Sequence, residues 1–351
     1  MSAKPNAATT TARTTGTPRE RVLLNSARNG DGEAFGRLIE PYRFDLLAHC
    51  YRMLGSYADA EDVLQETLLR AWRGLSKFEE RSSPRSWLFR IATNACLRAI
   101  ERRPKRVLPI DFAPAADPHD GLAEAVTEPI WLEPYPDTRL GLDSPAGPEV
   151  RYEQREAVEL AFIAALQHLP ARQRAALILR DVLGFSAREA AAVLETTPVS
   201  IDSALQRAHK TVAERMPGRS QQHTLHHLGD DELRRLVGRY IDAWERNDVD
   251  TVVSMLAEDA RMTMPPLPTW FSGRDRIAAF LRRYALADIK RWRLIPTSAN
   301  GQPALAGYLW ESQTAAYRPY CLYVLTLREA QIAEITAFVT PETFQRFGLP
   351  E

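Results

Sequence analysis

The sequence predicts a multidomain protein: two all-α helical domains followed by one α+β domain. Three observations predict it. Apolar residues recur at helical spacing through 33–103 and again through 155–212. A proline-rich acidic stretch separates these two blocks. Beyond residue 300 the pattern changes to alternating and β-branched runs, which are typical of strands. A chain of 351 residues has room for two or three domains.

The first block predicts three helices. One covers Glu33–Leu54, and the second is expected to be capped by Asp59 and to end at Gly74. The third runs from about Pro84 to Arg103. On the second helix we expect a buried apolar face made of Ala60, Val63, Leu64, Thr67, Leu68, Ala71 and Trp72.

The second block predicts four helices that end in a helix-turn-helix. Helices over Arg155–Leu169 and Pro170–Leu183 come first. Ser186 and Glu189 have the spacing of a capping box. After a short turn, Thr197 can cap a helix whose first residue is Pro198. This last helix would enter the major groove of DNA.

Polar side chains of that last helix lie off its apolar face and can touch DNA. Small and amide groups can contact base edges, while Arg207 and Lys210 can hold phosphates. An ordinary helical hairpin is the alternative for this segment taken alone. The candidate DNA-contacting residues are Ser200, Ser203, Gln206, Arg207 and Lys210.

The charge of the chain is zero overall but is unevenly distributed. Residues 1–106 carry 19 basic and 12 acidic residues, whereas residues 107–149 carry one basic residue, nine acidic residues and eight prolines. A basic block suggests a nucleic-acid surface, and the acidic stretch is a linker. Trp131 and Tyr135 interrupt that linker and are expected to anchor it on a folded surface. The predicted divisions are a disordered tail 1–18, a helical domain 19–106, the linker 107–149, a helical domain 150–217, a second linker 218–229 and the α+β domain 230–351.

The α+β domain is expected to begin with a helix over Asp231–Leu256. Strands follow over Ala304–Ser312, Pro319–Leu327 and Ile332–Val339. The stretch from Arg328 to Gln331 would turn the last pair.

Several classes of protein are disfavoured by composition. The three cysteines are scattered, so neither a disulfide framework nor a metal site is expected, and the pattern fits the reducing cytoplasm. No apolar run reaches the roughly 18 residues that a membrane helix needs. No cofactor is implied.

At this point the sequence resembles a known family. The segment Asp59–Trp72 resembles the core-polymerase-binding helix of sigma-70 family factors. The segment Ser86–Leu97 is similar to the helix that melts and reads the promoter −10 element. Residues Leu169–Arg174 and the helix-turn-helix are similar to the domain that reads the −35 element. Their order and spacing resemble those of the extracytoplasmic function group.

The resemblance implies roles for individual residues. Asp62, Gln65 and Glu66 would contact the β′ clamp helices of core RNA polymerase. Promoter DNA would be the second partner, and Arg103, Lys105 and Arg106 would add phosphate contacts. Trp87 would either stack on melted DNA or belong to the core. The residues expected at the −10 element are Trp87, Arg90, Asn94, Arg98 and Arg102.

Two features modify this expectation. The acidic linker would thread transiently toward basic walls near the polymerase active site; a soluble tether is the alternative. Asp202 and Ala204 stand where many members of the family have basic residues, so a different −35 sequence is expected.

Residues 230–351 resemble the SnoaL-like group, in which helices cover a curved sheet to form a cone. All seven histidines lie at or before His227, so a histidine acid–base mechanism is excluded there. We expect a regulatory domain without catalysis, and a small ligand or an anti-sigma protein as a further partner. Core packing is the alternative for the aromatic residues that would line a pocket, Tyr240, Trp244, Trp270 and Trp310.

Two other functions compete with a sigma factor. The chain could be a SnoaL-like enzyme or ligand-binding protein fused to a DNA-binding regulator, but it has no nucleophile motif. It could also be a repressor that binds DNA without polymerase, but the segment Asp59–Trp72 argues against that.

Overall fold

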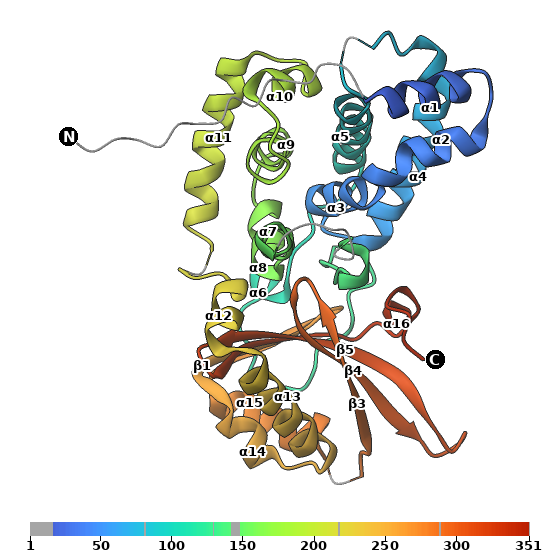
Figure 1. Ribbon diagram of the computed structural model, residues 1–351. Helices are drawn as coiled ribbons and strands as arrows, with labels where there is room; N and C mark the ends of the chain where they lie inside the picture. Colours follow the sequence, from blue (N-terminus) through green and yellow to red (C-terminus); the bar gives the residue numbers. More distant parts are fainter. Residues whose placement is uncertain are drawn as a thin grey trace.

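A computed structural model shows a helical part stacked on one end of a sheet-containing part (Figure 1). Most of the expected tail 1–18 lies outside the residues that the structure describes, and so does the end of the linker at 142–147. The described residues are 17–80, 82–128, 130–141, 148–216, 218–287 and 289–350.

In the described part of the first helical block, four of the five α-helices have a side-chain N-terminal cap, and α3 has none. Thr17 and Glu20 form a capping box on the first helix. Ser56, and not Asp59 as expected, caps the helix that begins at Tyr57. Asp59 instead lies one turn in and binds arginine side chains. The helices are α1 (Pro18–Arg28), α2 (Gly32–Ile39), α3 (Arg43–Leu54), α4 (Tyr57–Gly74) and α5 (Pro84–Arg102).

The second block contains the predicted helix-turn-helix. Ser186 and Glu189 form the capping box, and Thr197 caps the helix that begins at Pro198. The helix expected over Arg155–Leu169 is broken near Glu159, whose carboxylate caps another helix instead. The helices are α7 (Pro148–Glu156), α8 (Leu160–Gln167), α9 (Ala171–Leu177) with a π-helical continuation (Ile178–Val182), α10 (Ala187–Val193) and α11 (Pro198–Ala213).

The C-terminal part is a six-stranded sheet with helices against it (Figure 1). The strand order is β2-β1-β6-β5-β4-β3, with β1 and β6 parallel and the other pairs antiparallel. The strands are β1 (Leu256–Met264), β2 (Leu267–Ser272), β3 (Trp292–Ala299), β4 (Gln302–Glu311), β5 (Ala316–Arg328) and β6 (Gln331–Phe338).

The helix expected over Asp231–Leu256 is two helices, α13 (Asp230–Glu245) and α14 (Val249–Ser254). Chain reversal at Asn247, which has a φ of +55°, separates them. The segment 218–229, expected to be only a linker, contains α12 (Gln221–Leu228). The remaining helices are α6 (Pro109–Phe112), α15 (Arg274–Phe280), continued by a π-helical turn (Leu281–Ala285), and α16 (Thr343–Arg346).

Three hydrophobic clusters hold these parts together. One cluster runs without a break through both helical blocks and includes Leu132 and Tyr135 of the linker. A second lies between the sheet and α13–α15. A third, on the opposite face of the sheet, joins β4 and β5 to Leu160 of α8 and Phe344 of α16. The two helical blocks therefore share one core, and both faces of the sheet are covered.

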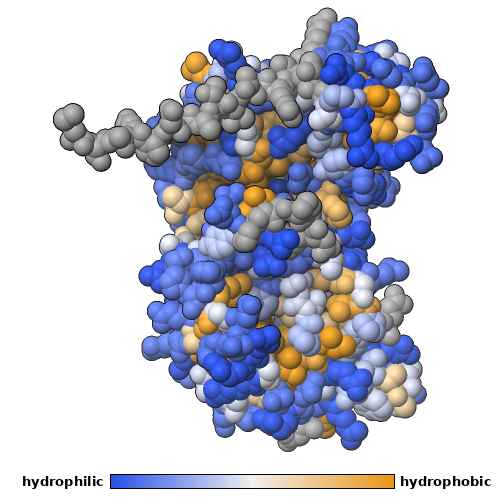
Figure 2. All heavy atoms as spheres, in the orientation of Figure 1, coloured by the Kyte–Doolittle hydropathy of each residue, from blue (hydrophilic) through white to orange (hydrophobic). Residues whose placement is uncertain are grey.

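The distribution of hydrophobic residues on the surface agrees with the shared core of the two helical blocks. In the face shown in Figure 2, hydrophobic residues gather over α9, between the α11 side and the α5 side of the helical part. Among the described helices, none is both long enough and apolar enough for a membrane span.

Candidate polymerase and nucleic-acid interfaces

The three residues expected to contact polymerase lie on the outer side of α4. Asp62 and Gln65 are exposed, and Glu66 is half-buried and forms an ion pair with Arg70. Leu69 follows one turn later and is 57% exposed. Sequence reasoning did not include Leu69, although its place off the apolar stripe could have identified it. Trp72 and Leu68, expected to be buried, are only partly covered.

Helix α5 presents four of its five expected DNA-contacting residues to solvent. Arg90 and Arg102 are exposed, and Asn94 and Arg98 are half-buried between them. Trp87 is 7% exposed and packs on Phe78, with ring centroids 4.7 Å apart. Trp87 is thus a core residue in this structure, which leaves little of its ring free to stack on a base.

The basic end of α5 is partly used inside the protein. Arg103 and Arg106 both form ion pairs with Asp59 of α4, and Arg106 is buried and also donates to the carbonyl of Trp131. Sequence reasoning placed these two arginines on DNA phosphates. In this structure they tie α5 and the linker to the start of α4, and Arg102 and Lys105 remain exposed.

The residues expected to read the −35 element are grouped on the outer side of α11. Ser203 is half-buried, and Ser200, Gln206, Arg207 and Lys210 are exposed. Their opposite face, Ile201, Leu205 and Ala208, is buried. Val199, in the first turn, is 75% exposed although it is apolar. Residues near the N-terminus of a recognition helix reach base edges, so Val199 joins this set.

The linker anchors Trp131 and Tyr135 are both buried. Tyr135 is fully enclosed, with its ring centroid 4.7 Å from that of Tyr51 and 5.6 Å from that of Tyr57. Trp131 donates to the carbonyl of Val126 and lies edge-on to Phe112. The linker also follows the edge strand β2: the Ala116 and Val126 amides donate to carbonyls of Trp270 and Pro266.

The four aromatic residues expected to line one pocket are not brought together. Tyr240 and Trp244 are fully buried and stacked in the core beneath the sheet. The Trp270 indole donates to the carbonyl of Ala113 in the linker, 2.7 Å away. Trp310 lies edge-on to Tyr317 across β4 and β5. Packing and linker binding use these side chains, as the alternative of core packing predicts for Tyr240 and Trp244.

Direct contacts hold the two helical blocks together. The Arg85 guanidinium of α5 donates to the carbonyl of Leu183 and lies over the ring of Phe185, which also packs edge-on against Phe89. Arg174 of α9 is buried and donates to the carbonyl of Met53 at the end of α3. Burial lowers the pKa of Arg174 to about 10, which leaves it charged at neutral pH.

The tight turn between β3 and β4 contacts every other part of the protein. Asn300 and Gly301 have φ values of +56° and +68°, as in the Asn-Gly hairpin turns that match strand twist. The fully buried Asn300 amide donates to the Tyr51 hydroxyl of α3 and to the carbonyl of Val158, each at 2.8 Å, and accepts from the Tyr135 amide at 2.9 Å.

The residues after Asn300 extend these bonds. The Gly301 amide donates to Asp137 of the linker, and the side-chain Oε1 of Gln302 accepts from the Leu160 amide of α8. A β-carbon on Gly301 would meet Arg155 at 3.0 Å. We refer to Asn300, Gly301 and Gln302 as the junction turn, because it binds α3, the linker and α8 at one point.

Comparison with known families identifies the class of protein that this architecture defines. The family model for Sigma-70 region 2 matches residues 38–106, and the model for Sigma-70 region 4 matches residues 159–212. The model for the SnoaL-like domain matches residues 237–335. The first two ranges contain the α4, α5 and α11 faces described above.

The chain belongs to the extracytoplasmic function (ECF) RNA polymerase sigma factors. It is 43% identical over 329 residues to the ECF RNA polymerase sigma factor SigG of Mycobacterium tuberculosis, covering 92% of this chain and 85% of that protein. SigJ of the same species is 26% identical over 328 residues, which is 89% of this chain and 94% of SigJ. The crystal structure of SigJ has the same fold, with a TM-score of 0.55 over 89% of this chain and 98% of that one, at 23% identity.

Proposed function

We propose that this sigma factor binds the β′ clamp helices of core RNA polymerase through Asp62, Gln65 and Glu66, with Leu69 beside them. The α5 residues Arg90, Asn94, Arg98 and Arg102 contact the −10 element. The α11 set, extended by Val199, contacts the −35 element. The working units are 19–106, 150–217 and 230–351; the acidic linker 107–149 joins the first two, and the segment 218–229 joins the last two. In this proposal the C-terminal domain is regulatory and takes no part in catalysis.

The packing of the two helical blocks carries the proposal for regulation. The −10 and −35 elements are about 25 base pairs apart, which is about 85 Å of B-form DNA at 34–36 Å per turn. Helix α9 packs against both α5 and α11, and packed helices lie about 8–10 Å apart. A protein with this packing cannot span both elements. We infer that this packing is a closed form that has to open on polymerase.

The C-terminal domain holds this closed form together. The junction turn bonds to α3 of the first block and to α8 of the second, and the linker is bound along β2. Opening therefore requires the C-terminal domain to release at least one of these partners. A covalently attached domain acts at high effective concentration, so modest contacts are enough to keep the protein closed.

Run-off transcription with purified core polymerase tests the sigma activity. The full chain is expected to give discrete promoter-dependent transcripts. Truncation after Pro217 is expected to change their amount if the chain remains folded. Absence of promoter-specific initiation by any form contradicts the proposed function.

Fluorescence energy transfer tests opening independently. Dyes on Val22→Cys in α1 and Ala192→Cys in α10 report the distance between the helical blocks, because the three native cysteines are buried. Strong transfer is expected in the free protein, and a large loss in the promoter complex. Transfer that stays strong in an active promoter complex contradicts a closed form that has to open.

A further inference from the structure

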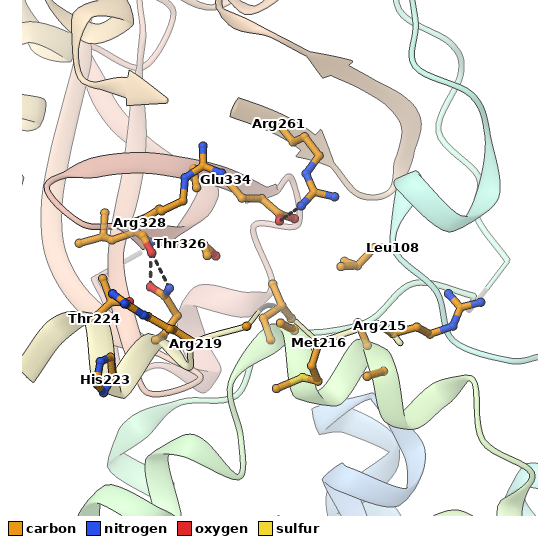
Figure 3. A pocket seen from close by; sticks show the side chains of 18 of the residues that line it. Leu108, Arg215, Met216, Arg219, His223, Thr224, Arg261, Thr326, Arg328 and Glu334 are labelled. Carbon is orange, nitrogen blue, oxygen red and sulfur yellow. Dashed lines mark hydrogen bonds and ion pairs between the residues drawn. The ribbon is translucent and has the colours of Figure 1, made fainter. Parts of the chain in front are cut away.

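A cleft of about 1240 Å³ lies where the second helical block, the linker and the C-terminal domain meet. Its walls come from α8, the segment after α11, α12, the turn between β5 and β6, β1 and the α6 region. Figure 3 shows Arg261 and Glu334 on one side of it, Arg219 and Arg328 on another, and Arg215 with Met216 and Leu108 on a third. The volume exceeds the roughly 300–1,000 Å³ of typical small-molecule pockets.

One wall of the cleft is aliphatic. It consists mainly of Leu160, Ala161 and Ala164 on α8, with Leu327 and Ala333 from the sheet. Among the described lining residues there is no phenylalanine, tyrosine or tryptophan. A nucleobase binds best by stacking on such rings, whereas an aliphatic chain needs only apolar area to cover. The wall therefore favours a ligand with an aliphatic body.

Two arginines of the cleft, Arg261 and Arg215, have only long ion pairs. Arg261 is 3.8 Å from Glu334, and Arg215 is 3.6 Å from Asp111. The pair between Arg346 and Glu133, elsewhere in the protein, is 2.9 Å long. Within the described chain no carboxylate lies within ion-pair distance of Arg219. Guanidinium groups bind carboxylates and phosphates through paired hydrogen bonds at about 2.7–2.9 Å, so these donors have unused capacity.

Acidic groups also face the cleft and have to be included. Asp111 and Glu334 are the partners of Arg215 and Arg261, and Glu214 and Glu329 are exposed to solvent. Burial raises the pKa of Glu334. Arg328 is already bound to Asp259. Arg215 also forms a hydrogen bond with His168 Nε2, 3.2 Å away. The available donors are therefore Arg219 and Arg261.

We propose that this cleft binds an aliphatic organic anion. Its carboxylate or phosphate group binds Arg219, which has no carboxylate partner in the described chain, and its chain covers the α8 wall. The proposal rests on the closed form described under the proposed function. Since the cleft exists only when the three parts are together, the ligand stabilises that form. At a concentration 100 times its Kd, it raises the ratio of closed to open protein about 100-fold.

Calorimetry on the free full-length protein tests the site without polymerase. The probes are decanoate and decyl phosphate, both below their micelle concentrations, together with decanol and inorganic phosphate. Saturable binding of one equivalent is expected for decanoate, decyl phosphate or both. The probe that binds more tightly shows whether the natural ligand carries a carboxylate or a phosphate. Decanol and inorganic phosphate are expected to bind at least tenfold more weakly. Equal binding of decanol overturns the role of the arginines.

Two variants locate the site. Arg219→Gln removes one donor from an exposed position, and Ala164→Phe fills the α8 wall from a half-buried position at the edge of the helical core. Each variant is expected to weaken binding of the anionic probe at least tenfold. The matched control is Arg234→Gln, which changes an exposed arginine on α13 and is expected to leave probe binding unchanged. Absence of saturable binding, or binding that neither variant weakens, overturns the proposal. Because calorimetry needs no polymerase, a failure of run-off transcription would be distinguishable from a failure of this site.

Discussion

The outer faces of α4, α5 and α11 differ from the junction turn in how their side chains are held. On the outer faces, residues such as Asp62, Arg90 and Arg207 are exposed on regular helices. At the junction turn, Asn300 is fully buried and uses its carbonyl and amide groups on three separate partners. Exposed polar groups exchange protein contacts for water at little cost, whereas a buried polar group left without a partner costs about 1–3 kcal/mol.

This difference separates binding from regulation. Substitution on an outer face is expected to weaken one contact with polymerase or DNA and to leave folding unchanged. Substitution at the junction turn is expected to change the balance between closed and open forms while leaving the outer faces intact. Four experiments test this separation, from the largest expected effect to the smallest.

The substitution Asn300→Ala is expected to have the largest effect. It leaves the Tyr135 amide and the Val158 carbonyl without their partner, which costs the closed form about 3 kcal/mol, or about 100-fold in the closed-to-open ratio. Energy transfer between the two labelled blocks is expected to fall in the free protein, and transcription to rise. Asn300→Asp, which keeps an acceptor for Tyr135, should lie between the two. Unchanged transfer in the alanine variant would show that the turn does not hold the protein closed.

Asp62→Arg tests the α4 face. Reversing a charge in the centre of an interface costs about 2 kcal/mol or more, so affinity for core polymerase is expected to fall about 30-fold or more. The melting temperature is expected to stay the same because Asp62 is exposed. Arg234→Asp on α13 is the matched charge reversal away from this face, and an equal loss in both variants would argue against a specific contact.

Lys210→Ala tests the α11 face. Loss of one phosphate contact is expected to weaken binding roughly equally on all promoter sequences and to reduce the slope of log K against log salt by about one. Val199→Ala should instead weaken binding only where a thymine methyl faces it. Titrations of promoter fragments at several salt concentrations separate these outcomes; a sequence-dependent effect of Lys210→Ala would assign it to base contact.

The pH dependence of closing is the smallest expected effect. Burial raises the pKa of Glu159 from 4.5 to about 7, and the hydrogen bonds that its carboxylate accepts from the Gln221 and Gln222 amides only partly offset this rise. Because the pKa of Glu159 is higher in the closed form, closing takes up a proton. The stability that this protonation gives the closed form is lost as the pH rises through about 7. Lowering the pH from 8 to 6.5 is expected to favour the closed form about fourfold.

Other groups near the contact limit the pH window. Glu156 repels the Glu159 carboxylate and adds to the rise in its pKa. Burial lowers the pKa of His168, which opposes closing only below its ordinary pKa of 6.5. Energy transfer measured between pH 6.5 and 8 should follow Glu159 and be flat in Glu159→Gln. A pH response that survives this substitution would have to come from another group.

Much of the architecture could be predicted because its signals are local. The capping box at Ser186, the Thr197-Pro198 start of α11 and the change to strand-like runs after residue 300 each depend on neighbouring residues only. Asp59 was misassigned as a cap because Ser56 has the same local chemistry and lies at the position that the backbone uses. The choice between a pocket and core packing for the aromatic residues stayed open in the sequence, since the positions of Trp270 and Trp310 depend on strand pairing and on the linker.

The sequence by itself determined the helical blocks, the helix-turn-helix, the acidic linker and the order of the three parts, because helical spacing, caps and charge are encoded over a few residues. Even the turn at Asn300-Gly301 is visible as a hairpin signal. Only the tertiary structure decided what that asparagine binds. Its partners, Tyr51, Tyr135 and Val158, come from three distant segments, and no local pattern encodes which polar groups will be buried together.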